Sequence, residues 1–215
     1  MIRATEAAVA VDEAVLLPAT TFSLENSRAL AITGPNGSGK TTLLRALAGL
    51  VQPTSGSVAI NGRQVDESDA AFRALVAALV YLPPVARNLT VEEHLRLVLA
   101  SWGWREPNIK GDVADQLKAL QIDHLARRFP HELSAGQNQL FALALTLIRP
   151  SKVLLLDEPE RHLDTEHREL IQAVLAQRKT DGTTIAFATH ESMLVNELAD
   201  SALDVGLLDV GPDSV

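Results

Sequence analysis

The chain has 215 residues, is 47% hydrophobic, and carries a formal net charge of −8 with no cysteine. This length suits one domain with a sizeable core, and the lack of cysteine excludes disulfides and thiol chemistry. The acidic balance comes without a cluster of lysine or arginine. It therefore argues against nucleic acid as a partner, because binding a phosphate backbone needs a basic footprint.

No stretch of the sequence has the pattern of a targeting or membrane-spanning segment. Residues 1–15 lack the basic region followed by an apolar run that marks a signal peptide. The longest apolar run, residues 140–148, is far shorter than the roughly 18 residues that a membrane span needs. We therefore expect a chain that is soluble by itself, which still permits docking onto a membrane protein.

The first predicted elements are strands that lead into a glycine-rich loop. Residues 9–15 and 20–26 alternate like short antiparallel strands, and residues 28–33 read as a buried strand. The stretch GPNGSGKTT, residues 34–42, follows directly and fits G-x-x-x-x-G-K-[ST]. A short helix then ends at Gly49.

The residue types in this loop point to the capture of a nucleotide triphosphate. Glycines let successive N–H groups turn inward around phosphates, and the following helix adds its unpaired N-terminal amides and positive dipole end. Lys40 would reach the terminal phosphates, and the Thr41 hydroxyl would bind Mg²⁺. The alternative is an ordinary glycine-rich turn before a helix, and a chance match to the whole pattern is rare.

The middle of the chain is predicted to change from strands to helices. Turn residues in 53–63, with a hairpin glycine at Gly62, surround a short strand, and residues 78–83 look like a buried strand stopped by proline. Residues 90–101 and 112–120 are amphipathic, the first with a capping box at Thr90.

From Ser134 onward, helices alternate with strands, and this order predicts a mostly parallel sheet covered on both faces. The helices are residues 134–148 and 164–179, and the strands are residues 152–158 and 183–190. In such sheets ligands lie at the carboxyl ends of the strands.

Two acidic residues stand at one of those strand ends. Asp157 and Glu158 follow an apolar strand, where they are costly unless a metal or a hydrogen-bond network uses them. Asp157 fits an Mg²⁺ partner, and Glu158 fits a base or orienter for an attacking water. The alternative is two solvated residues at a strand end.

The segment HELSAGQ, residues 131–137, opens the next helix with Ser134 at its N-cap. Taken alone, it would be an ordinary cap. The functional alternative is a second anion site, in which the Ser134 hydroxyl, the Gly136 N–H and the helix dipole face a γ-phosphate.

In order and spacing, GPNGSGKTT, LSAGQ, VLLLDEP and the histidine that ends IAFATH resemble the ATP-binding subunit of ABC transporters over nearly the whole chain. The resemblance implies a head-to-tail dimer with each ATP between one subunit's phosphate loop and the other's LSAGQ. It also implies that His190 contacts the γ-phosphate and links it to Glu158. The implied nucleotide-binding residues are Asn36, Gly37, Ser38, Gly39, Lys40, Thr41, Thr42, Ser134, Gly136 and Gln137.

Three departures from the family pattern stand out. The aromatic residue that stacks on adenine is missing near Val11, and Pro84 replaces the usual glutamine after the strand at residues 78–83. After DEP the family usually has TSALD, whereas this chain has ERHLD, residues 160–164. We expect this change to bring Glu160, Arg161 and His162 to the dimer seam.

We therefore expect an α/β fold in residues 1–215: a RecA-like P-loop core with an antiparallel β subdomain and a helical subdomain at roughly 84–150. We predict an ATPase that uses ATP and Mg²⁺ and powers a separate transmembrane subunit from the cytoplasmic face of the membrane. The short chain favours an exporter. The main alternative is a weakly hydrolytic regulatory ATPase that works as an ATP-dependent dimerising switch. A P-loop kinase or GTPase would lack LSAGQ and His190. An ABC ATPase of DNA repair or translation would need a long coiled-coil insertion or a second ATPase domain, and residues 40–134 leave no room for either.

Overall fold

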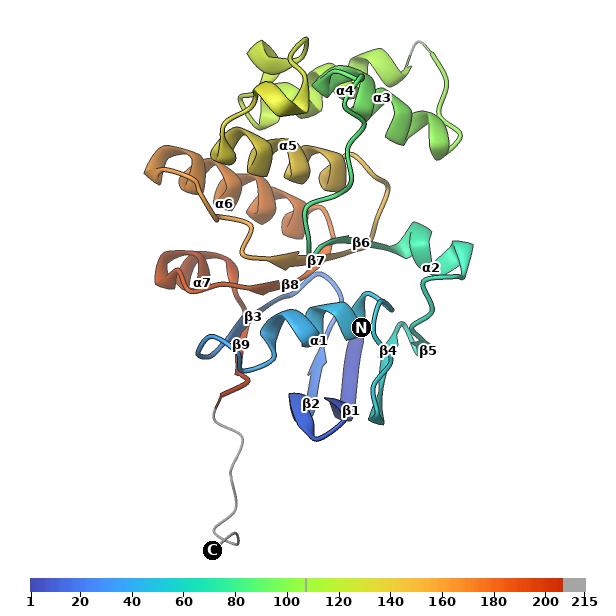
Figure 1. Ribbon diagram of the computed structural model, residues 1–215, viewed down its shortest axis with the longest axis vertical. Helices are drawn as coiled ribbons and strands as arrows, with labels where there is room; N and C mark the ends of the chain where they lie inside the picture. The colour runs from blue at the N-terminus through green and yellow to red at the C-terminus, as the bar shows by residue number, and fades with distance from the viewer. Residues whose placement is uncertain (107, 207–215) are drawn as a thin grey trace, which may run out of the picture.

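The structure is a computed structural model that describes residues 1–106 and 108–206. Two sheets form its framework (Figure 1): an antiparallel sheet in the order β2-β1-β4-β5 and a parallel sheet in the order β6-β7-β8-β3-β9. The strands are β1 (Ile2–Val11), β2 (Ala14–Leu24), β3 (Ala29–Thr33), β4 (Ser55–Ile60), β5 (Arg63–Gln64), β6 (Val76–Leu79), β7 (Val153–Asp157), β8 (Thr184–Ala188) and β9 (Ser201–Asp204). The predicted α/β class is confirmed.

The helices lie on both faces of the parallel sheet. In Figure 1, α1 lies between the two sheets, whereas α5 and α6 lie on the opposite face, with α3 and α4 beyond them. The helices are α1 (Lys40–Leu47), α2 (Ala70–Leu75), α3 (Val91–Ser101), α4 (Asn108–Ala119), α5 (Ala135–Leu147), α6 (Thr165–Thr180) and α7 (Ser192–Leu198). Residues 84–150 therefore contain α3 to α5, and the bounds of the helical subdomain stay a prediction.

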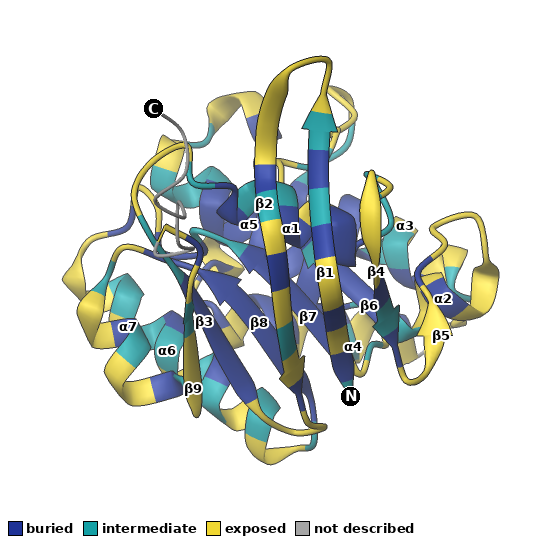
Figure 2. Ribbon diagram, turned by 90° about the horizontal axis from the view of Figure 1, so that it is seen from below, coloured by how far each residue is buried: buried dark blue, intermediate teal, exposed yellow. Residues whose placement is uncertain are grey.

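Two apolar cores meet at the parallel sheet. Along β7, Leu154 and Leu156 belong to the core shared with α3 to α6, whereas Val153 and Leu155 belong to the core shared with α1 and the antiparallel sheet. Both sets are buried because helices cover one face and the second sheet covers the other, as the dark strands of Figure 2 show. The strand is apolar throughout for this reason.

Local turn chemistry explains several element boundaries. Asn61 and Gly62 both have positive φ, 51° and 75°, in the tight turn between β4 and β5, which confirms the predicted hairpin glycine. Thr90 and Asp164 accept a backbone N–H at the starts of α3 and α6, so both predicted helix starts are confirmed.

The predicted strand at residues 78–83 is wrong in its bounds. The strand β6 begins at Val76 and its pairing with β7 ends at Leu79, opposite Leu156. Beyond that point the chain leaves the sheet, and Tyr81 and Leu82 are 55% and 62% exposed. An apolar run marks the strand, but it does not show where the chain turns away from β7 and pairing stops.

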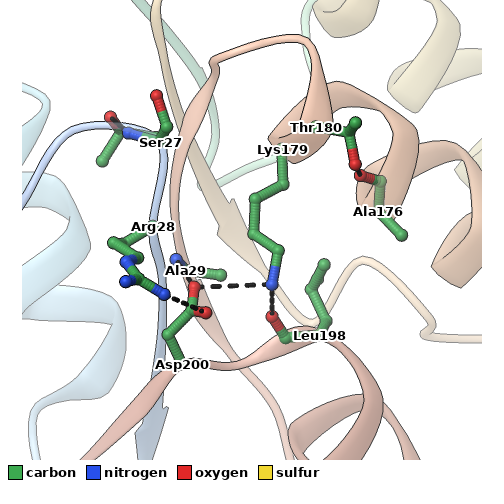
Figure 3. A network of polar contacts seen from close by, with 9 residues as sticks. Ser27, Arg28, Ala29, Ala176, Lys179, Thr180, Leu198 and Asp200 are labelled. Carbon is green, nitrogen blue, oxygen red and sulfur yellow. Dashed lines mark hydrogen bonds and ion pairs between the residues drawn. The ribbon is translucent and has the colours of Figure 1, made fainter.

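One carboxylate bridges three elements at an end of the parallel sheet (Figure 3). Asp200 accepts hydrogen bonds from the Ala29 N–H at 2.7 Å and from the Arg28 guanidinium at 3.1 Å, and the Lys179 ammonium lies 3.4 Å away. Partial burial raises the pKa of Asp200, but these donors outweigh it and hold the pKa below its usual value. The network joins β3, the end of α6 and the start of β9.

Candidate nucleotide site

The phosphate loop joins β3 to α1 and leaves the N-terminus of α1 without a side-chain cap. The N-cap residue Gly39 is left-handed, with φ 107°, and the glycines at 34 and 37 also have positive φ. A Cβ on Gly39 would lie only 2.7 Å from the Leu16 carbonyl oxygen, so this position requires glycine. The first N–H groups of α1 have no side-chain acceptor, as an anion-binding helix end requires.

The Lys40 side chain folds over the loop that precedes it. Its ammonium donates to the carbonyl oxygens of Gly34 at 2.8 Å and Pro35 at 3.0 Å, and the residue is only 7% exposed. A bound phosphate would offer this ammonium a charged acceptor, which makes a stronger hydrogen bond than a neutral carbonyl does.

A cleft of about 280 Å³ opens beside this loop. Its lining includes Val15 and Leu16 of β2 and the acidic residues Asp157 and Glu158. The loop residues in the lining are Asn36, Gly37, Gly39, Lys40, Thr41 and Thr42. Ser38 is the one predicted loop residue outside this lining, and its hydroxyl oxygen is buried without a partner in the described part of the chain.

Thr41 and Asp157 meet in this cleft. The Thr41 hydroxyl donates to a carboxylate oxygen of Asp157 at 2.6 Å, although 116 positions separate the two residues. Burial raises the pKa of Asp157, and the Thr41 hydrogen bond opposes that rise. A hydroxyl and a carboxylate are hard oxygen donors, and a divalent cation would favour the charged carboxylate, so both residues fit Mg²⁺. No cluster of three or more His, Cys, Asp or Glu suited to a metal exists among the described residues, so phosphate oxygens and waters would complete the coordination.

Glu158 lines the cleft and has a left-handed backbone conformation, φ 47°. Its N–H donates to the Ala188 carbonyl of β8 at 2.9 Å, and the buried Gln139 amide donates to the carbonyl oxygens of Glu158 and Pro159 at 3.2 and 3.1 Å. The strain is thus held by contacts from two other elements.

The Glu158 carboxylate faces two cationic or titratable side chains. The Nε2 atom of His190 lies 3.6 Å from one carboxylate oxygen, and the Nε atom of Arg161 lies 3.8 Å from the other. All three side chains reach solvent. The structure therefore brings together Glu158 and His190, the two predicted catalytic residues, at the ends of the neighbouring strands β7 and β8.

The LSAGQ segment has a different local structure. Ser134 caps α5 by accepting the Gln137 N–H at 3.3 Å, while the Gln137 side chain accepts the Ser134 N–H at 3.0 Å. Gly136 faces the His162 carbonyl, and a Cβ there would come within 2.8 Å of that oxygen. Ser134, Gly136 and Gln137 do not line the cleft beside the phosphate loop. Within one chain, among the described residues, the two predicted anion sites are therefore separate.

Several residues at the site were not expected from the sequence. Val15 and Leu16, rather than the position near Val11, line the nucleotide cleft. Gln139 supports the backbone of Glu158, and no sequence signal beyond its place in α5 points to that contact. Glu160 was expected at the dimer seam, but within the chain it is only 7% exposed and bonds to Thr189; Arg161 and His162 are exposed, and their place at a dimer seam stays a prediction.

The fold is that of the P-loop nucleoside-triphosphatase class, with the phosphate loop and the acidic strand end at one edge of a parallel sheet. A family model described as ABC transporter matches residues 17–161. The chain therefore belongs to the ABC transporter family. The match includes the phosphate loop, LSAGQ and Glu158 and ends before His190.

Relatives with curated names agree with this family. The chain is 36% identical to a sulfate/thiosulfate import ATP-binding protein of Pectobacterium atrosepticum, over 83% of this chain and 56% of that protein. It is 35% identical to a putative 2-aminoethylphosphonate import ATP-binding protein of Salmonella choleraesuis, over 92% and 53%. It is also 35% identical to an sn-glycerol-3-phosphate import ATP-binding protein of Chromohalobacter salexigens, over 83% and 48%. The chain thus spans about half the length of these relatives.

A solved structure titled "Structure of ATP binding subunit of ABC transporter" has the same fold, with a TM-score of 0.84 at 24% identity, over 94% of this chain and 85% of that one. This likeness confirms the expected P-loop fold. In the described part of the chain, no helix is both long and apolar enough to cross a membrane.

Proposed function

We propose that this chain binds ATP with Mg²⁺ and hydrolyses it to drive a separate transmembrane transporter subunit. The observation that carries the proposal is the cleft in which the uncapped start of α1, Lys40 and the pair Thr41 and Asp157 converge. Backbone N–H groups and the Lys40 ammonium would hold the phosphates, and Thr41 and Asp157 would hold Mg²⁺, which would neutralise phosphate charge when bound.

In this mechanism Glu158 accepts a proton from the attacking water, or orients that water, at the open rim of the cleft. His190 lies beside the Glu158 carboxylate and would contact the γ-phosphate. A second subunit would cover the phosphates with Ser134, Gly136 and Gln137, because these residues do not line the cleft of their own chain. ATP binding would close this dimer, and hydrolysis would reopen it.

We propose import, in place of the export that the shortness of the chain suggested. The relatives reported above carry the word import in their names. The chain covers only 48% to 56% of these relatives, so its length does not indicate the direction of transport. The exposed apolar residues Tyr81, Leu82 and Val85 after β6 offer a surface for the transmembrane partner. This assembly would work at the cytoplasmic face of the membrane.

One observation keeps a weakly hydrolytic regulatory ATPase as a second candidate. Arg161 lies 3.8 Å from the Glu158 carboxylate and would compete with water for it. In that case Arg161→Ala should raise ATP turnover severalfold. If Arg161 does not restrain Glu158, the substitution leaves turnover unchanged.

Turnover and trapping of ATP test the main proposal. Glu158→Gln should keep ATP affinity and lower turnover by about 10² to 10⁴-fold, leaving an ATP-loaded dimer on size analysis. Turnover equal to that of the wild type would remove Glu158 from the mechanism.

Mixed dimers test the shared site. Lys40→Ala and Ser134→Arg chains, each also carrying Glu158→Gln, should trap no ATP alone. Mixed dimers isolated through two different tags should trap about one ATP, because one site is then intact and the other is doubly broken. Mixed dimers that hold none would contradict the head-to-tail arrangement for two copies of this chain.

A further inference from the structure

Glu158 and His190 sit on two separate segments that follow neighbouring strands. Residues 158–163 follow β7, and residues 189–191 follow β8. At the surface, the link between the two side chains is a 3.6 Å approach between partly exposed groups. Such exposed pairs contribute little energy and do not fix a side chain by themselves. Besides the backbone hydrogen bond from Glu158 to Ala188, the relative position of these two side chains therefore depends on buried contacts between the segments.

A buried hydrogen bond links the segment that follows β7 to the segment that follows β8. Glu160 is 7% exposed and Thr189 is 1% exposed, and the Thr189 hydroxyl donates to the Oε1 atom of Glu160. The same hydroxyl oxygen accepts the Glu191 N–H at 2.9 Å. The Thr189 hydroxyl thus donates its one proton to Glu160 and accepts the Glu191 N–H on its oxygen, so this one side chain bonds to both segments.

The position of Glu160 is costly for stability. Its second oxygen, Oε2, is buried with no hydrogen-bond partner among the described residues. Burial raises the pKa of Glu160, and the carboxylates of Glu158 and Glu191 raise it further. Glu191 is itself paired with Arg168 of α6 at 2.6 Å. This ion pair holds the C-terminal end of the segment 189–191. A buried carboxyl group with one unpaired oxygen lowers the stability of the fold, so stability alone does not account for Glu160.

We propose that Glu160 is a positioning residue, whose hydrogen bond with Thr189 sets the place of His190 relative to Glu158. This inference rests on the proposed ATP hydrolysis. Glu160 does not face the cleft that would hold the nucleotide, so it acts only through the segment that carries His190. Losing the bond frees that segment at one end and leaves the nucleotide cleft unchanged.

Steady-state kinetics on the full chain separate positioning from binding. Thr189→Val keeps the shape of the side chain but removes the donor, and Glu160→Leu removes the acceptor. Each should lower kcat by about ten- to a hundredfold, because small displacements of a catalytic group have effects of that size, with KM for ATP nearly unchanged. Thr189→Ser and Glu160→Gln keep the donor and the acceptor, so both should restore most of the turnover.

A matched control is available in α5. The buried Thr146 hydroxyl donates only within its own helix, to the Ala142 carbonyl at 2.9 Å. Thr146→Val therefore removes a buried hydroxyl of the same kind without touching the link, and it should keep wild-type turnover. Thr189→Val with wild-type kcat would overturn the inference, as would a rise in KM that matches the fall in kcat.

Amide hydrogen exchange gives a readout that needs no turnover. In Glu160→Leu, exchange in residues 189–191 should be at least about tenfold faster, because the Glu191 N–H bonds to a hydroxyl that has lost its own anchor. Exchange in β7 and β8 should not change. Unchanged exchange in residues 189–191 overturns the inference. A wild-type chain without turnover overturns the proposed function, and the exchange result then still decides whether Glu160 holds this segment.

Discussion

The N-termini of α1 and α5 are built in opposite ways. The start of α1 has a left-handed glycine and no side-chain cap, whereas Ser134 and Gln137 cap the start of α5 reciprocally. The uncapped end leaves its N–H groups for a ligand, and the capped end uses two of them for local stability. The comparison teaches that the start of α1 keeps its N–H groups available for an anion, while the start of α5 already uses two of them within its own chain.

The largest expected effect is at α1. Lys40→Ala should weaken ATP binding to the single chain by about 100-fold, because hydrogen bonds to charged groups contribute about 1.5 to 3 kcal/mol each. Isothermal titration calorimetry with Mg²⁺ and ATP measures this. Ser134→Ala serves as the control and should leave single-chain affinity unchanged. Equal losses in the two variants would mean that one chain presents both helix ends to the same phosphate.

The backbone of the phosphate loop comes next. Gly39→Ala should lower the free energy of unfolding by about 1 to 3 kcal/mol, through its left-handed φ and the 2.7 Å approach to Leu16. Gly62 has positive φ but open space around it, so Gly62→Ala should cost less, about 1 kcal/mol. Urea unfolding of both variants measures these losses in the free energy of unfolding. Similar losses would show that a small backbone shift relieves the close approach to Leu16.

The cap of α5 should have a smaller effect on stability. Ser134→Ala should cost about 1 kcal/mol, which lowers the melting temperature by about 2 to 4 °C for a chain of this size. Ser134→Asp keeps an acceptor for the Gln137 N–H and should keep the stability, yet its charge should repel phosphate and prevent ATP trapping in the dimer. If Ser134→Asp traps ATP normally, this helix end does not face the nucleotide.

The smallest effect concerns the carboxylate beside α1. Because burial raises the pKa of Asp157, the folded chain binds its proton more tightly than the unfolded chain does, and stability falls as pH rises from about 3.9. In chelator, Asp157→Asn should therefore be more stable than the wild type at neutral pH, and this gain should vanish in acid. Denaturant unfolding at two pH values measures it; a variant that is less stable at neutral pH contradicts the assignment.

The sequence predicted the parts of this site that depend on local geometry. The loop from Gly34 to Thr42 and the cap at Ser134 were predicted because glycine, lysine and serine act there through the neighbouring backbone. Glu160 and Gln139 were missed because their roles depend on Thr189 and on the backbone of Glu158, which are 29 and 19 positions away. The end of β6 was misplaced for the same reason, since it depends on pairing with β7, which is remote in the sequence.

The alternation along β7 has a consequence for how the molecule melts. Four of its five residues separate the two cores, with Leu154 and Leu156 in one core and Val153 and Leu155 in the other. Neither core can lose its packing without removing one face of the strand that leads to Asp157. We therefore expect one cooperative heat-absorption peak, with equal calorimetric and van't Hoff enthalpies. Thermal damage to either core would then disable the nucleotide site at the same temperature.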